Sequence, residues 1–120
     1  MTGRIVLIED DPDIAALVTD VLTEVGHHVD VRADLAECAP DSDVQLVITD
    51  LIALRSYDAQ AARDWIARVR VVFPKATVIV STAHAPAGAS GPVALGADAV
   101  LTKPFDIGIF TQTVESLLGR

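Results

Sequence analysis

Leu46-Val47-Ile48-Thr49-Asp50 is the stretch that decides the fold. Apolar and β-branched residues follow one another and a carboxylate ends the run, a pattern typical of a parallel strand buried on both faces. Asp50 is therefore expected at the carboxyl end of a strand, the edge at which open α/β sheets bind ligands. A lone Asp after a strand more commonly caps a helix or makes a turn, so a functional assignment needs other residues at the same edge.

A second apolar run, Ile5-Val6-Leu7-Ile8, also ends in acid, this time in Glu9-Asp10-Asp11. If the two strands are neighbours, their carboxylates converge, and two unit charges about 4 Å apart repel by roughly 1 kcal/mol in water and roughly 4 kcal/mol at an effective dielectric of 20. A counter-ion relieves that repulsion. Oxygen ligands suit a hard cation, and a site with few protein ligands suits Mg²⁺, which keeps waters and shares its shell with phosphate. The sequence therefore predicts a Mg²⁺ site with room for a phosphoryl group.

Length and composition indicate the number of domains and the cellular location. The chain has 120 residues, 51% of them hydrophobic, which predicts a single domain over residues 1–120 with one real core. A formal net charge of −8 disfavours direct binding to nucleic acid or to an anionic membrane. The single cysteine, Cys38, excludes an internal disulfide, and neither a signal pattern nor an apolar run of membrane-spanning length is present. We expect a cytoplasmic location.

The rest of the chain alternates helical and extended patterns. Helices are expected from Asp11 to Gly26, over a short stretch at 34–39, from about 57 to 73 and after Asp106; further strands are expected at 27–31, 44–49, 77–81 and 99–102. This alternation predicts a parallel sheet with helices on both faces and right-handed crossovers. The strand at 27–31 is the more polar one and is expected at an edge of the sheet. Two prolines and two glycines within 86–92 predict that any fourth helix is short or irregular.

Four strand ends then carry chemistry: Glu9-Asp10, Asp50, Thr82 and Lys103. An Asp carboxylate is a fair nucleophile, so Asp50 could accept a phosphoryl group once a cation neutralises the phosphoryl oxygens. The Thr82 hydroxyl could donate to a phosphoryl oxygen, and Lys103 could supply a positive charge. Taken singly, Thr82 could equally be an ordinary strand-end threonine, and Lys103 a surface lysine.

At this point the sequence resembles the receiver domain of two-component response regulators, over nearly the whole chain from Arg4 to Leu118. The resemblance rests on four motifs: Val-Leu-Ile-Glu-Asp-Asp at 6–11, Val-Ile-Thr-Asp at 47–50, Val-Ile-Val-Ser-Thr-Ala at 78–83, and Gly-Ala-Asp-Ala-Val-Leu-Thr-Lys-Pro-Phe at 96–105. It implies a flavodoxin-like, doubly wound, five-stranded parallel sheet in the order 2-1-3-4-5.

The resemblance also implies a role for each site residue. Glu9, Asp10 and Asp50 would hold Mg²⁺ together with the backbone carbonyl of Ile52. Asp50 would take a phosphoryl group from a sensor histidine kinase or a phosphotransfer protein. Thr82 and Lys103 would contact that group, with a cis peptide between Lys103 and Pro104. The fourth helix, fifth strand and fifth helix would then present the switched surface to a downstream effector protein or domain.

Three departures from the family pattern stand out. The loop after Asp50 lacks the Met-Pro and Asp-Gly elements common in receivers, Val100 replaces the usual aromatic residue, and the stretch 83–95 replaces a regular fourth helix. Ile52 and His84 stand at the two positions that flank the path of the attacking water in this family. Because Ile52 cannot orient a water, we expect a long phosphoryl lifetime. His84 could shorten it by assisting hydrolysis, or it could be an exposed loop histidine with no role in the reaction, which is the interpretation we favour.

Two other functions compete with a phosphorylation-driven switch. A receiver fold could serve as an interaction module that is never phosphorylated, although a module of that kind has no need for a repelling carboxylate cluster. A metal-dependent phosphatase with an aspartyl nucleophile is the third alternative, disfavoured because residue 52 is not a second Asp and 120 residues leave no cap domain. A receiver would catalyse its own phosphotransfer and autodephosphorylation without being a classical enzyme. The apolar face of the last helix is compatible with a homodimer.

Overall fold

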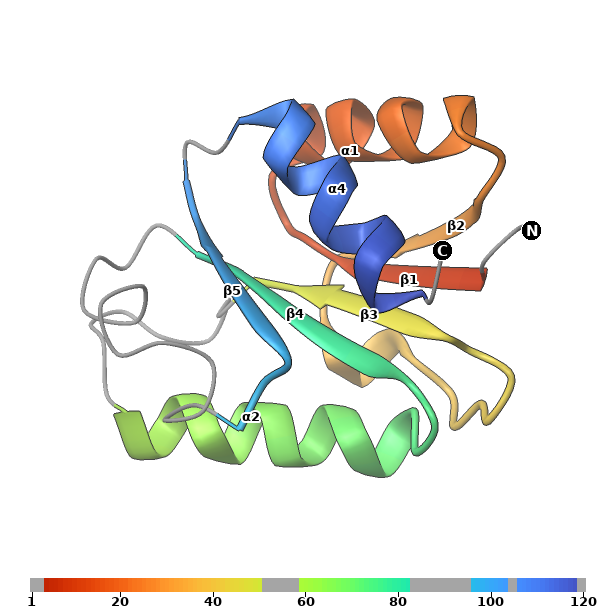
Figure 1. Cartoon of the computed structure of the whole chain (residues 1–120). Coiled ribbons are helices and arrows are strands. Elements are labelled where there is room, and N and C mark those ends of the chain that lie inside the picture. Colours follow the sequence, from red (N-terminus) through yellow and green to blue (C-terminus); the bar gives the residue numbers. More distant parts are fainter. Residues whose placement is uncertain (1–3, 51–58, 83–95, 104–105, 119–120) are drawn as a thin grey trace.

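Five parallel strands form one sheet in the order β2-β1-β3-β4-β5 (Figure 1). The computed structural model describes residues 4–50, 59–82, 96–103 and 106–118. The strands are β1 (Arg4–Ile8), β2 (His28–Arg32), β3 (Leu46–Thr49), β4 (Thr77–Thr82) and β5 (Ala99–Thr102). This is the strand order that the resemblance implied, and the more polar strand β2 lies at an edge as expected.

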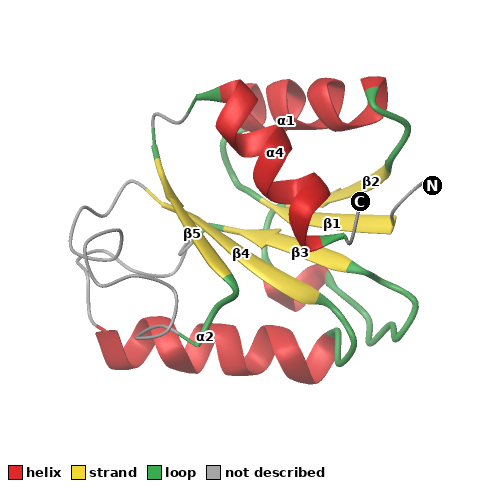
Figure 2. Ribbon diagram, in the orientation of Figure 1, coloured by secondary structure: helices red, strands yellow, loops and turns green. Residues whose placement is uncertain are grey.

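Helices cover both faces of the sheet, which confirms the predicted architecture. Within the described residues they are α1 (Pro12–Glu24), α2 (Ala59–Val72) and α4 (Ile107–Leu117), with one 3₁₀ turn, η1 (Leu35–Glu37). Figure 2 shows α1 and α4 on one face and α2 on the other. None of the helices in these ranges is both long and apolar enough to cross a membrane.

The single core that the composition predicted is divided in two by the sheet, because side chains alternate between its faces along each strand. Odd-numbered residues of β1, such as Ile5 and Leu7, pack with α1 and α4, where the buried helical residues are Ala15, Val18, Leu22, Phe110 and Val114. Even-numbered residues, such as Val6 and Ile8, pack with α2, where the buried residues are Ala62, Trp65, Ile66 and Val69. The central strand β3 is buried at every position, as its unbroken apolar pattern predicted.

The helix after β1 begins where the sequence predicted. Asp11 caps it by accepting hydrogen bonds from the backbone N–H groups of Asp13 and Ile14, and Pro12 occupies the first helical position. The chain leaves the helix through Gly26, whose φ of 96° lies in the left-handed region that glycine adopts without strain. This turn returns the chain directly into the edge strand β2.

The predicted and observed bounds differ most at two elements. The helix expected at 34–39 is the single 3₁₀ turn η1, and the strand expected from Val44 begins at Leu46. Val44 is nevertheless buried, with 1% of its surface exposed, and the Gln45 N–H donates to the Arg4 carbonyl, so the pairing of β1 and β3 starts just before the strand. The predicted irregular fourth helix falls within 83–95, outside the described residues.

Candidate functional site

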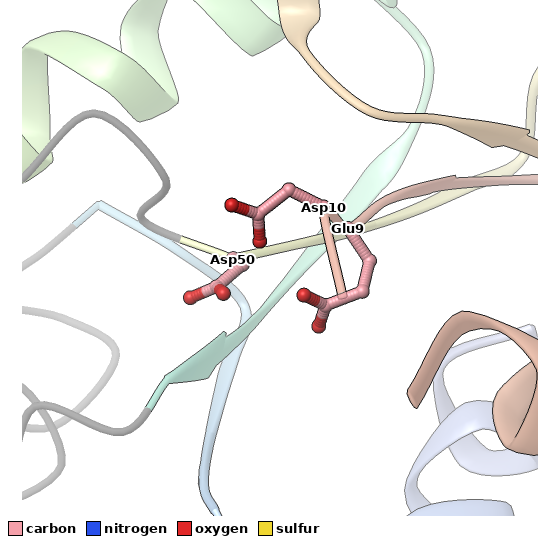
Figure 3. A group of neighbouring side chains, drawn as sticks. All are labelled: Glu9, Asp10 and Asp50. Carbon is pink, nitrogen blue, oxygen red and sulfur yellow. The ribbon is translucent and has the colours of Figure 1, made fainter. Parts of the chain in front are cut away.

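The carboxylates that the sequence placed at strand ends meet at the carboxyl edge of the sheet. Ile8 of β1 is paired with Thr49 of β3, so the acidic residues that follow them emerge side by side. The Asp50 N–H continues the ladder by donating to the Ile8 carbonyl at 3.0 Å. Figure 3 shows Glu9, Asp10 and Asp50 clustered at this edge, and one carboxylate oxygen from each lies within 4.8 Å of the others.

Lys103 enters the same cluster from β5, across the intervening strand β4. Its Nζ lies 2.6 Å from Glu9 Oε1 and 3.1 Å from Asp50 Oδ2. Main-chain contacts fix the position from which the Lys103 side chain extends, because Thr82 pairs with Thr102 and the Lys103 N–H donates to the Thr82 carbonyl at 2.7 Å. One ammonium group thus bridges the two carboxylates.

The site is partly desolvated, and this shifts the pKa values of Glu9 and Lys103. Burial raises the pKa of Glu9, whose residue is only 4% exposed, and this outweighs the opposing hydrogen bonds from Lys103 and the Asp11 N–H. Burial by itself would lower the pKa of Lys103, but its hydrogen bonds to Glu9 and Asp50 outweigh burial and raise it. Lys103 is therefore held in its charged form beside the two carboxylates.

The donor set fits a hard divalent cation. Glu9, Asp10 and Asp50 offer oxygen ligands only, as Mg²⁺ prefers. With all three carboxylates ionised and Lys103 protonated, three negative charges and one positive charge leave −2, which a divalent cation neutralises. Glu9, Asp10 and Asp50 are the residues that would hold the ion. Ile52, whose backbone carbonyl the resemblance adds to this set, lies outside the described residues.

Thr82 lies where the sequence placed it, at the carboxyl end of β4, and it is fully buried. Its backbone carbonyl contacts Lys103, so the structure brings these two residues together through the main chain. The predicted role of its hydroxyl toward a phosphoryl group stays a prediction. His84 and the Lys103–Pro104 peptide are not tested, because residues 84 and 104 fall outside the described ranges.

Sequence reasoning missed a contact directly beside Asp50. The Thr49 hydroxyl donates to the Asp50 carbonyl at 2.8 Å and accepts a hydrogen bond from Trp65 Nε1, also at 2.8 Å. The sequence predicted a helix from about 57 to 73, which contains Trp65, but it predicted no contact for the indole. No pattern in the sequence pairs a strand residue with an indole sixteen positions further on, because that pairing depends on how α2 crosses the sheet.

Comparison with known proteins agrees with this geometry. No family model matches the chain. The transcriptional regulatory protein TcrA of Mycobacterium tuberculosis is 38% identical over 125 residues, covering 98% of this chain and 46% of TcrA. The chain thus spans about half the length of that curated relative.

Two solved structures extend the comparison. A response regulator receiver protein from Burkholderia phymatum superimposes with a TM-score of 0.72 at 25% identity, covering 98% of this chain and 95% of that one. The receiver domain of the sensor histidine kinase PA1611 from Pseudomonas aeruginosa, solved with a magnesium ion in its active-site cleft, covers both chains completely with a TM-score of 0.71 at 21% identity.

The fold and the acidic edge define a doubly wound α/β domain of the receiver type. Over 98% of its length the chain is similar to a response regulator receiver protein, and the receiver domain of response regulators is the class of protein that this fold and site define.

Proposed function

We propose that this chain, as a single receiver domain over residues 1–120, accepts a phosphoryl group on Asp50 in a Mg²⁺-dependent reaction. The observation that carries the proposal is the joint presence of three carboxylates and one bridging ammonium at the carboxyl edge of the sheet. The magnesium ion in the cleft of the PA1611 receiver supports the same cation here. When bound, Mg²⁺ would neutralise charge on the phosphoryl oxygens.

The residues of the chain divide the work. An Asp50 carboxylate oxygen attacks phosphorus and forms a P–O bond, while the P–N bond of the donor phosphohistidine breaks; its electron pair stays on the imidazole nitrogen, which takes up a proton from water. Lys103 contacts the Asp50 carboxylate before the reaction, so its ammonium group can exchange that contact for one with a phosphoryl oxygen afterwards. Thr82 donates its hydroxyl to the same group. Glu9, Asp10 and Asp50 would hold the cation, together with the backbone carbonyl of Ile52.

The phosphoryl donor would be a sensor histidine kinase or a phosphotransfer protein in the cytoplasm. A downstream effector protein or domain would receive the signal. Phosphorylation shifts a conformational equilibrium only through contacts that differ between the two states. Lys103 supplies such a contact, because its side chain binds Asp50 while its main chain directly follows β5 and is hydrogen-bonded to the end of β4. With Val100 half-buried against the core on the α2 side, β5 has no aromatic residue there to reorient.

Intact-mass analysis after incubation with a small-molecule phosphodonor tests the proposal. We expect one phosphoryl adduct that requires Mg²⁺ and is absent from Asp50→Asn. Asp20→Asn is a matched control, because Asp20 is an exposed carboxylate on α1 and is not one of the three clustered carboxylates. An adduct that persists in Asp50→Asn would reject Asp50 as the acceptor, and no adduct in the folded wild-type chain would favour a phosphorylation-independent interaction module.

A further inference from the structure

A chain of two hydrogen bonds runs from α2 to the main chain of Asp50. Trp65 Nε1 donates to Thr49 Oγ1, and Thr49 Oγ1 donates to the Asp50 carbonyl. Both links are 2.8 Å long, Thr49 is fully buried, and Trp65 is 4% exposed. These two hydrogen bonds are therefore shielded from water.

The chemistry of the three groups gives the hydrogen-bonded chain a direction. An indole N–H can only donate, so Trp65 fixes the Thr49 oxygen as its acceptor. The hydroxyl has a single hydrogen, which then points to the Asp50 carbonyl. Arg68 lies 5.1 Å from the centre of the Trp65 ring in cation–π contact, which further restrains the indole.

Asp50 is consequently held at both polar groups of its main chain. Its N–H donates to the Ile8 carbonyl of β1, and its carbonyl accepts from Thr49. With the backbone fixed between β1 and α2, only side-chain torsions remain to aim the carboxylate, and Lys103 restrains those at 3.1 Å. A reacting group must be held within about 0.5 Å of its productive position to react efficiently.

We propose that Trp65 and Thr49 are positioning residues for the phosphoacceptor: they orient Asp50 for cation binding and for attack on phosphorus, without touching either. The inference rests on the proposed function and adds to it two residues that lie outside the acidic cluster. It predicts that the hydroxyl of Thr49, and not only its shape, is needed for full activity.

Four variants test this. Thr49→Val keeps the shape and removes the hydroxyl, Thr49→Ser keeps the hydroxyl, Trp65→Phe removes the N–H donor, and the double variant Thr49→Val/Trp65→Phe removes both groups. We measure the rate of Mg²⁺-dependent phosphorylation by intact mass, Mg²⁺ affinity by calorimetry, and Tm. Thr49→Val and Trp65→Phe should each slow phosphorylation about five- to tenfold, the loss expected for one hydrogen bond.

The other two variants should separate positioning from packing. Thr49→Ser should retain the rate to within about twofold, because it keeps the hydrogen bond. The double variant should be little slower than either single one, since both remove the same chain of hydrogen bonds.

Val69→Ala is the control for stability, because Val69 is fully buried in α2 within the same core. It should lower Tm while leaving Mg²⁺ affinity and phosphorylation rate unchanged. Rates that follow Tm across all the variants, or a Thr49→Val variant as active as the wild type, would overturn the positioning role.

Failure of the proposed function gives a different result. If the wild-type chain binds Mg²⁺ but takes no phosphoryl group, the phosphoacceptor role falls, and the ratio of Mg²⁺ affinities between Thr49→Ser and Thr49→Val decides the positioning role alone. A wild-type chain that binds no Mg²⁺ would overturn both.

Discussion

Lys103 is the residue on which the electrostatics of the site depend. It neutralises part of the repulsion between Glu9 and Asp50, two groups that the sheet forces together. A phosphoryl group on Asp50 would offer the same ammonium a stronger, doubly charged partner. Lys103 is therefore suited to stabilise the unphosphorylated site and to detect its phosphorylation.

Replacing Lys103 by Met should lower the free energy of unfolding by about 1–3 kcal/mol in the absence of Mg²⁺. The loss leaves the buried carboxylate of Glu9 without its ammonium partner. Urea unfolding monitored by circular dichroism measures the change, and added Mg²⁺ should restore part of it.

Lys75→Met is the matched control, because Lys75 is the only other lysine and is exposed. It should change stability by less than about 0.5 kcal/mol. Equal losses in the two variants would show that the Lys103 bridge contributes nothing to folding.

For the individual site residues, the sequence predicted where the acidic side chains lie but not the side chain with which they pair. Glu9, Asp10 and Asp50 were predictable, because parallel strands in register end at one edge of the sheet. The bridge from Lys103 to Glu9 was not predicted, because it depends on a long side chain reaching from β5 past β4 and β3 to the end of β1.

Among the elements, α4 is held on the sheet by two kinds of contact. Phe110 and Val114 are fully buried against the strands and α1. Glu115 lies 2.5 Å from Nε2 of the buried His27, at the turn between α1 and β2. The last helix is thus joined both to the core and to the opposite edge of the sheet from β5.

Phe110→Ala should destabilise the domain by about 3–5 kcal/mol, because it empties a fully buried aromatic position in the core shared by α1 and α4. Ile109→Ala, one residue away and 56% exposed, should cost less than about 1 kcal/mol. Chemical denaturation of both variants measures the difference. Similar losses would mean that α4 is not docked through Phe110.

The elements that the sequence predicted well have caps and long periodic faces. α1 has Asp11, Pro12 and Gly26 at its ends, and Asp106 caps α4 by accepting from the Ile109 N–H. The helix expected at 34–39 shortened to η1, because six residues give too few internal hydrogen bonds to offset helix nucleation.

The whole molecule carries a formal net charge of −8, and within the described residues three carboxylates that could share a cation lie together at one edge of the sheet. A cation that binds only the folded chain stabilises it, by about 2.7 kcal/mol at a concentration one hundred times Kd. Titration with MgCl₂ should therefore raise Tm in a saturable manner.

Two controls separate site binding from general screening. NaCl at matched ionic strength should raise Tm less than MgCl₂, because screening acts on all surface charges weakly. Asp50→Asn should reduce the Mg²⁺ response, since it removes one of the three carboxylates. Identical curves for NaCl and MgCl₂ would reject a specific cation site.

The contact between α2 and Thr49 gives this domain an optical probe of its own. Trp65 is the only tryptophan in the chain, so all indole emission comes from one ring. That ring is two hydrogen bonds away from the Asp50 carbonyl. We therefore expect events at the phosphoacceptor to change the intrinsic fluorescence of the unlabelled protein, and the time course of that change would report the phosphoryl lifetime.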